Sequence, residues 1–200
     1  MRDLSVPEKN ISGKTLKMKA SFGLRRPHII INFDSLTIKK MNKFKIVPLS
    51  KSFAEKIRLT MRDDFGHQVT EQIATGAGPC RVSLKPFKRA VDKRLLFTHS
   101  PFDIDNAYNQ PGPIFINSAD VEEYSDIYLF PPEIKADKKS FPLTLIGYGA
   151  SQQMVCTKLV GDDDVDELII ELFETQPDVE YLHVRNAQAC CFICKVERLN

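Results

Sequence analysis

The chain has 200 residues, of which 42% are hydrophobic and 27% are charged, and its formal net charge is +2. This composition is typical of a folded globular protein and excludes a largely disordered chain, while 12 Pro and 9 Gly exclude collagen-like and low-complexity classes. No apolar run approaches the ~20 residues that a membrane span requires, which excludes an integral membrane protein and a membrane partner.

Positive charge is concentrated at the start of the chain. Residues 1–40 contain nine Lys or Arg against three Asp or Glu, whereas residues 41–200 contain 19 against 23. We predict a disordered basic leader over 1–40, upstream of a natural start at Met41, and a single globular domain over 41–200. A targeting peptide, a nucleic-acid-binding arm and an added strand at Ile29–Phe33 are the alternatives for the leader. The acidic balance of the domain argues against nucleic acid as its partner.

The first predicted elements follow directly after the leader. The run Phe44–Val47 is typical of a strand. Hydroxyls at Ser50 and Ser52 are available to cap a short helix, which is predicted by three apolar residues at four-residue spacing. These residues are Phe53, Ile57 and Met61. A second strand is predicted over Val69–Ile73, before a break at residues 76–79.

The middle of the chain alternates between strands and loops. Apolar and polar residues alternate over Cys80–Leu84, which predicts a half-buried strand, and a further strand is predicted over Arg94–Thr98. Residues 99–112 form the longest predicted loop, ahead of a strand that includes Ile114–Ile116. Loops of about this length without secondary structure are uncommon and often functional. Pro131 and Pro132 are predicted to end the next segment.

The last third of the chain gives the clearest signals. Leu143–Tyr148 and Met154–Val160 read as a hairpin, and Glu180–Arg185 and Phe192–Glu197 as two more strands. Five apolar residues at helical spacing follow an acidic run and predict a helix. These are Val165, Leu168, Ile169, Leu172 and Phe173. Most connections are too short for crossover helices, so we predict an α+β fold, a mostly antiparallel sheet with two short-to-medium helices packed on it.

The five cysteines and the absence of a secretory signal predict free thiols in a reducing cytoplasm. On a strand, Cys191 and Cys194 point to opposite faces and lie too far apart for a disulfide. No second C-x-x-C pair completes a zinc site, so we predict no metal and no cofactor. A Cys/His-dependent hydrolase or transferase stays open as an alternative, with Cys80 or Cys191 as nucleophile and His99 or His183 as base.

Polar residues gather in two segments that we expect to meet. By strand alternation, Tyr181, His183 and Arg185 share one face, with Leu182 and Val184 on the other. We predict a polar pocket between this face and the 99–112 loop. Its further contacts are predicted to be Arg81, Tyr108 and Asn186. Because Arg185 suits a carboxylate or phosphate, the expected ligand is a small anionic molecule. A non-catalytic module that binds a protein or forms a homo-oligomer through a strand edge is a second alternative.

Three blocks of the sequence resemble a known bacterial family. The blocks are Pro79–Leu84; Ser100–Phe102 with Asn106–Asn109 and Gly112–Ile116; and Tyr181–Ala187 with Cys191–Arg198. In their order and spacing the chain, from about Phe44 to Arg198, resembles the family known as "domain of unknown function 1203". The resemblance implies a small, soluble bacterial protein that starts near Met41, with glycine where this chain has Cys190. It implies no activity, cofactor or catalytic residue.

Overall fold

Every strand pair is antiparallel, which confirms the α+β class with antiparallel sheets. The computed structural model describes residues 43–199, so the leader predicted over 1–40 lies outside the described residues. Within that range the elements are β1 (Phe44–Val47), α2 (Lys51–Thr60), β2 (Thr70–Ile73), β3 (Lys93–His99), β4 (Gly112–Asn117), α3 (Pro132–Ala136), β5 (Leu143–Tyr148), β6 (Met154–Leu159), α4 (Val165–Thr175), β7 (Tyr181–Asn186) and β8 (Phe192–Arg198). None of these helices has the length and apolarity to cross a bilayer.

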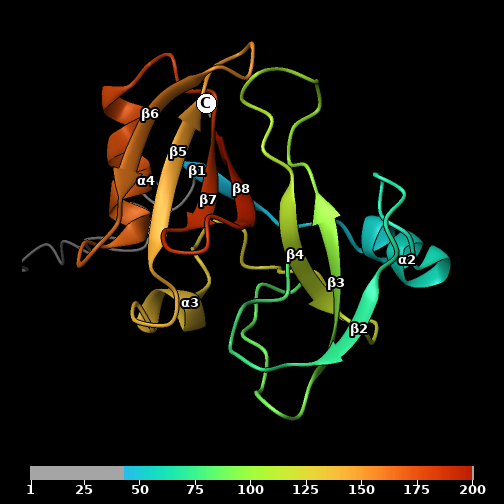
Figure 1. Ribbon diagram of the computed structural model, residues 1–200. Coiled ribbons are helices and arrows are strands. Elements are labelled where there is room, and N and C mark those ends of the chain that lie inside the picture. The colour runs from blue at the N-terminus through green and yellow to red at the C-terminus, as the bar shows by residue number, and fades with distance from the viewer. Residues whose placement is uncertain (1–42, 200) are drawn as a thin grey trace, which may run out of the picture. The chain divides into compact units, whose positions relative to one another are not determined.

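The strands form two sheets rather than one. Five strands pair in the order β1-β8-β7-β5-β6, and three pair in the order β2-β3-β4 (Figure 1). The first strand of the described chain pairs with the last, with Phe44 opposite Arg198. Strand β7 therefore lies at the centre of the larger sheet, with β8 on one side and β5 on the other.

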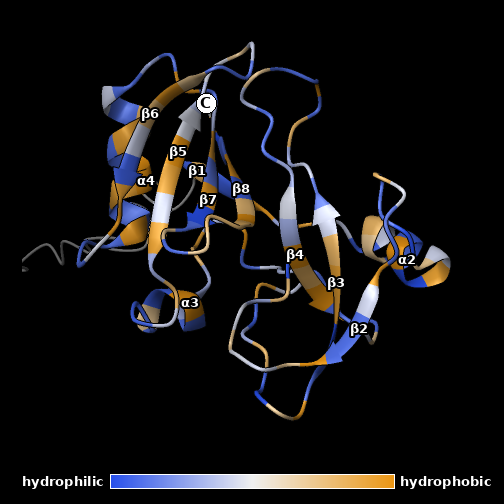
Figure 2. Ribbon diagram, in the orientation of Figure 1, coloured by the Kyte–Doolittle hydropathy of each residue, from blue (hydrophilic) through white to orange (hydrophobic). Residues whose placement is uncertain are grey.

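Helix α4 covers one face of the five-stranded sheet. The Asp164 side chain caps the helix by accepting hydrogen bonds from the backbone N–H groups of Asp166 and Glu167. The five apolar residues that predicted the helix are all buried, in the same hydrophobic cluster as Leu182 and Val184 of β7. Figure 2 shows hydrophobic and hydrophilic residues alternating along α4, as expected for a helix with one buried face.

A second hydrophobic cluster fills the space between α2 and the three-stranded sheet. It contains Ile57 of α2, Phe97 of β3 and Ile116 of β4. It also contains Phe192, although that residue begins β8 of the larger sheet. The two sheets therefore meet at the start of β8, and this junction positions the residues of the candidate site.

One prediction about local structure was wrong, and another was incomplete. Residues Cys80–Leu84 form a turn rather than a strand, with the Leu84 N–H donating to the Cys80 carbonyl at 2.9 Å and Leu84 at a φ of 52°. Their apolar and polar alternation does not mark two faces, because Arg81 is as buried as Val82. Pro131 and Pro132 follow the end of the preceding segment, as predicted, but Pro132 also begins α3, which was not predicted. Proline fits the first helical turn, where its missing N–H has no intrahelical partner.

Candidate functional site

Strand β7 divides its side chains between two environments. Leu182 and Val184 pack in the hydrophobic cluster under α4. Tyr181, His183 and Arg185 face the other side of the sheet, as period-two alternation requires. This second face of β7 is the floor of the candidate site.

The 99–112 loop lies over this floor and contacts it through Phe102. The Phe102 ring is edge-on to His183, with 4.9 Å between ring centroids, and edge-on to Tyr148 of β5 at 5.0 Å. Further along the loop, the Ile104 N–H donates to Oε1 of Gln152 at 3.4 Å, in the turn between β5 and β6. The structure therefore brings together the loop and the strand that the sequence singles out. We call Phe102, Tyr148, Tyr181, His183 and Arg185 the β7 site.

His183 is fully buried among aromatic rings. Four ring centroids lie around its imidazole, those of Tyr148 (4.8 Å), Phe102 (4.9 Å), Tyr181 (5.2 Å) and Phe192 (5.2 Å). The residue is 0% exposed, and neither Nδ1 nor Nε2 has a hydrogen-bond partner. Burial lowers the pKa of His183 from 6.5 to about 3, and positive charge on Arg185 and Lys195 acts in the same direction. The imidazole is therefore neutral at pH 7.

Arg185 brings a buried positive charge to the same face. It is 5% exposed, and its Nη1 donates to the Cys190 carbonyl at 3.0 Å, while Nε and Nη2 have no partner. Within residues 43–199, Arg185 forms no ion pair with a carboxylate. Burial raises the pKa of Tyr148, whereas the positive charge of Arg185 and hydrogen bonding between its guanidinium and the Tyr148 phenol lower it. A buried cation without an acidic partner favours a bound anion.

Unsatisfied polar atoms concentrate in the β7 site. Across residues 43–199, seven buried side-chain nitrogen atoms lack a hydrogen-bond partner, and four of them belong to His183 and Arg185. A fifth, Nδ2 of Asn106, lies in the 99–112 loop. Each unsatisfied buried group costs about 1–3 kcal/mol, so this concentration makes the β7 site the main candidate for a ligand-binding site.

A second buried arginine holds the neighbouring segment in place. Arg81, which is 1% exposed, donates from Nε to the Phe192 carbonyl at 2.8 Å and from Nη2 to the Cys191 sulfur at 3.3 Å. Its Nη1 donates to the Pro79 carbonyl. All three nitrogen atoms therefore donate hydrogen bonds within the protein. Arg81 connects the 80–84 turn to the start of β8 and does not face a ligand.

His99 lies next to this junction rather than in the β7 site itself. Its ring packs against Phe53 at 5.4 Å and Phe192 at 5.8 Å. Burial lowers the pKa of His99 from 6.5 to about 4; Asp64 opposes the shift, and the positive charges of Arg81 and Arg185 strengthen it. His99 is therefore a second neutral imidazole, and it shares Phe192 with His183.

Two of the residues predicted to contact the ligand, Asn186 and Tyr108, lie away from the β7 site. The Asn186 Oδ1 accepts the backbone N–H groups of Gln188 and Ala189, so this side chain stabilises the turn between β7 and β8. Tyr108 is exposed in the loop, and its backbone N–H donates to Asn106 Oδ1 at 2.8 Å. The structure does not bring these two side chains to the buried face of β7.

The cysteines named as nucleophiles have no histidine partner. Cys80 accepts the Asn117 N–H at 3.3 Å, and Cys191 accepts from Arg81. Within residues 43–199, no cysteine is hydrogen-bonded to a histidine, and the neutral rings of His99 and His183 are weak bases. No group of three or more His, Cys, Asp or Glu in that range is arranged to hold a metal ion.

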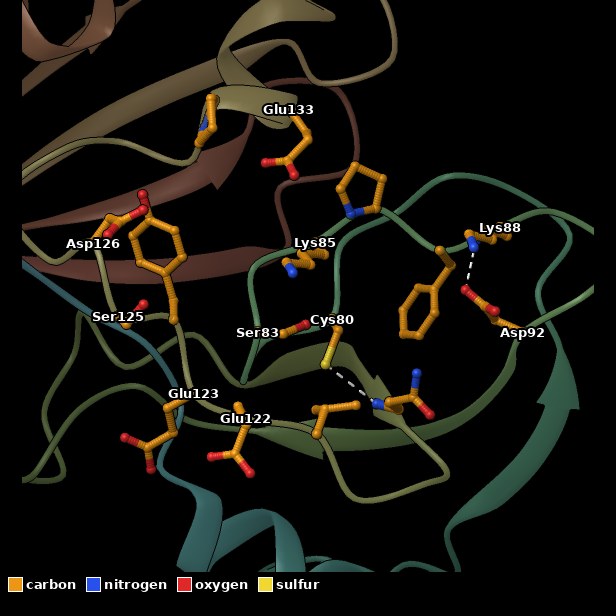
Figure 3. Close-up of a pocket in the computed structure, with 16 residues that line it drawn as sticks. Cys80, Ser83, Lys85, Lys88, Asp92, Glu122, Glu123, Ser125, Asp126 and Glu133 are labelled. Carbon is orange, nitrogen blue, oxygen red and sulfur yellow. Dashed lines mark hydrogen bonds between the residues drawn. The ribbon is translucent and has the colours of Figure 1, made fainter.

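A separate cavity of about 710 Å³ contains Cys80 (Figure 3). Five carboxylates and two ammonium groups line it. These belong to Asp92, Glu122, Glu123, Asp126 and Glu133, and to Lys85 and Lys88. The dashed line at the Cys80 sulfur in Figure 3 marks the hydrogen bond that this sulfur accepts from the Asn117 N–H. None of the partnerless buried nitrogen atoms in residues 43–199 lines this cavity, so it lacks the feature that marks the β7 site.

Three residues around His183 were missed by the sequence reasoning. Tyr148, Phe102 and Phe192 come from three different segments that meet only through long-range pairing. Tyr148 lies opposite Tyr181 in the β5–β7 register, so the correct strand order would have revealed it. For Phe102, the length of the loop was the available signal.

Comparison with known proteins identifies one family. No curated protein and no solved structure matches the chain. Residues 77–198 match the family described as "Protein of unknown function (DUF1203)", and this range includes every residue of the β7 site together with Arg81, His99 and Phe192. The chain therefore belongs to the DUF1203 family.

Proposed function

We propose that this protein binds a small anionic molecule between the 99–112 loop and strand β7, with Arg185 and His183 as its main contacts. The observation that carries the proposal is the group of four buried nitrogen atoms on these two residues that have no partner in the protein. An anion accepts hydrogen bonds from the guanidinium and from the imidazole N–H, which removes the cost of leaving those donors unsatisfied.

The charge of the surroundings supports an anion rather than a cation. Arg81 and Arg185 are both buried, and within residues 43–199 neither forms an ion pair with a carboxylate. Both guanidinium groups act on His99 and lower its pKa, which places them in one electrostatic neighbourhood. An anion in this neighbourhood is stabilised by both positive charges.

Entry of the ligand requires movement of the loop. His183 is 0% exposed beneath Phe102, so the Phe102 ring leaves its contacts with His183 and Tyr148 when the site opens. Residues 100–111 of the loop belong to neither sheet, so they can move without breaking a strand pair. We place this binding function in the bacterial cytoplasm, whose reducing conditions suit five free cysteines.

The test measures the melting temperature of the full chain with inorganic phosphate, sulfate and small carboxylates. An anion at a hundredfold excess over its Kd adds about 2.7 kcal/mol of stability, which corresponds to about 5–10 °C for a chain of this size. We expect at least one anion to raise the melting temperature saturably in the wild-type protein, and not in Arg185→Met, which keeps the bulk of the side chain but lacks the charge.

Arg94→Met is the matched control, because Arg94 is also buried but lies on β3, where it stacks over Phe115 at 3.8 Å. This variant is expected to lose stability and to keep the full anion response. The proposal fails if no anion stabilises the wild-type protein, or if Arg185→Met responds as strongly as the wild type does.

A further inference from the structure

We infer that the anion is a monocarboxylate on a flat apolar body such as an aromatic ring; this inference rests on the proposed function and specifies its ligand. Three features of the β7 site support it: the free edge of Arg185, the lack of a second cation with free donors, and the aromatic rings around it.

The free donors of Arg185 lie on one edge of the guanidinium. Nη1 is held by the Cys190 carbonyl at 3.0 Å, while the partnerless atoms are Nε and Nη2. The N–H groups of Nε and Nη2 are nearly parallel on the side-on edge of the plane, and their spacing matches the two oxygen atoms of a carboxylate. The bond to Cys190 fixes the guanidinium, so the ligand meets a donor pair that is already oriented.

Only one buried cation of the neighbourhood, Arg185, has N–H donors free to bind the ligand. All three nitrogen atoms of Arg81 are bonded within the protein, and Lys195 pairs with Glu197 at 3.1 Å while lying over the Tyr181 ring at 4.7 Å. The imidazole of His183 is neutral. A carboxylate therefore matches the free donor pair of Arg185, whereas the second charge of a phosphate meets no other cation with a free donor and is desolvated among aromatic rings.

The walls of the site suit a flat ring. Tyr148 and Tyr181 stack with 5.5 Å between centroids and 21° between planes, and Phe102 stands at 87° to Tyr148. An aromatic ring that enters the site can make edge-on contacts of the kind that Phe102 makes with Tyr148 and His183. Each such contact corresponds to roughly a two- to tenfold gain in affinity, which an aliphatic carboxylate of similar charge does not obtain.

Four anions that combine a carboxylate or a sulfonate head group with a methyl or a phenyl body test the head group and the ring separately. Titration calorimetry on the full chain compares acetate, benzoate, methanesulfonate and benzenesulfonate, with inorganic phosphate as a fifth anion. We expect benzoate to bind at least about tenfold more tightly than acetate, and more tightly than benzenesulfonate and phosphate.

Any other outcome contradicts the inference alone or both the inference and the proposed function. If benzoate binds within about threefold of acetate, or if phosphate or benzenesulfonate binds as tightly as benzoate, the inference is wrong. In that case, any binding that is lost in Arg185→Met still supports the proposed function. If none of the five anions binds, both the inference and the proposed function fail.

Variants test the two recognition elements separately. Phe102→Ala is expected to bring benzoate affinity close to that of acetate, while Phe65→Ala changes neither, because Phe65 is exposed and stacks on His67. Arg185→Lys keeps the positive charge without the donor pair, so it is expected to bring benzoate and benzenesulfonate affinities together. An unchanged benzoate preference in both Phe102→Ala and Arg185→Lys contradicts the inference.

Discussion

At the scale of single residues, His183 joins stability and binding in one side chain. Its ring fits among four others, but its two nitrogen atoms gain no hydrogen bond from that packing. A phenylalanine of similar shape would satisfy the same contacts without the unsatisfied atoms. The histidine therefore costs the free protein stability, as functional residues in buried sites often do.

The two buried histidines predict a loss of stability in mild acid. Their folded pKa values of about 3 for His183 and about 4 for His99 lie below the value of 6.5 for a free histidine. Between these pH values the unfolded chain binds more protons than the folded chain does. The contribution of the two neutral histidines to stability is therefore complete above pH 6.5 and falls as the pH falls toward 3. At pH 5 each histidine is expected to have removed about 2 kcal/mol from the free energy of unfolding.

Urea unfolding at pH 7 and pH 5 measures this loss. His183→Phe is expected to halve it and to be more stable than the wild type at both pH values, because the ring packs without unsatisfied nitrogen atoms. His67→Phe, at a histidine whose side chain is 66% exposed, controls for the substitution itself. Equal losses in the wild type and in His183→Phe would show that His183 is not a buried neutral imidazole.

At the scale of elements, the turn between β7 and β8 controls the orientation of Arg185. The Cys190 N–H donates to the Asn186 carbonyl at 2.9 Å, and the Cys190 carbonyl accepts from Arg185. Cys190 has a φ of 57°, a left-handed conformation that is costly for a residue with a Cβ atom. The family resemblance implies glycine at this position, and the positive φ supplies the physical reason.

We therefore expect Cys190→Gly to stabilise the protein. Removing the Cβ relieves the left-handed strain by about 1.5 kcal/mol, and the extra chain entropy of glycine offsets about half of this gain. The melting temperature should therefore rise by about 2–3 °C. Cys190→Ala retains a Cβ and is the matched control, with no gain expected. A loss of stability in Cys190→Gly, with none in Cys190→Ala, would mean that the cysteine side chain itself stabilises the turn.

At the scale of helices, strands and turns, the range of the interactions also explains which elements could be predicted from the sequence. β1, α2, α4 and the β5–β6 and β7–β8 hairpins follow from local periodicity, caps and turn residues, which act over a few neighbouring positions. The turn at Cys80–Leu84 could not be recognised, because its alternation reflects burial of Arg81 against β8, a segment about 110 residues away. Short α3 was missed because Pro132 starts helices as well as ending them.

At the scale of the whole described domain, the β7 site lies where two sheets with separate cores meet. Phe192 belongs to the cluster of the smaller sheet but begins a strand of the larger one, and its ring contacts both His99 and His183. The sequence suggested the 99–112 loop and β7 as partners, since both are rich in polar groups. It gave no information on which aromatic rings would close around them, because ring contacts depend on sheet order and not on spacing along the chain.

The Arg81 side chain forms hydrogen bonds across this junction. We therefore expect its removal to lower the free energy of unfolding substantially. Arg81→Met leaves the carbonyls of Phe192 and Pro79 without a donor, and it also removes a buried charge that has no acidic partner within residues 43–199. These effects oppose each other, and the lost donors at about 1–3 kcal/mol each exceed the relief. We expect a net loss of about 2–4 kcal/mol in the free energy of unfolding.

Urea unfolding of Arg81→Met against Arg94→Met measures this difference. Arg94 makes one hydrogen bond, to Thr75 Oγ1 at 3.1 Å, so its variant is expected to lose less. If Arg81→Met is as stable as the wild type, the Arg81 side chain adds no net stability at this junction.

The stacking of Tyr148 on Tyr181 has a practical consequence. The chain contains no Trp and five Tyr, so tyrosine absorption and emission are not masked by an indole. Two of those five phenols lie in face-to-face contact at 5.5 Å, directly beside the buried imidazole. Near-ultraviolet circular dichroism and tyrosine fluorescence therefore give an unlabelled signal from this part of the interior, and occupancy of the site can be followed optically in the unmodified protein.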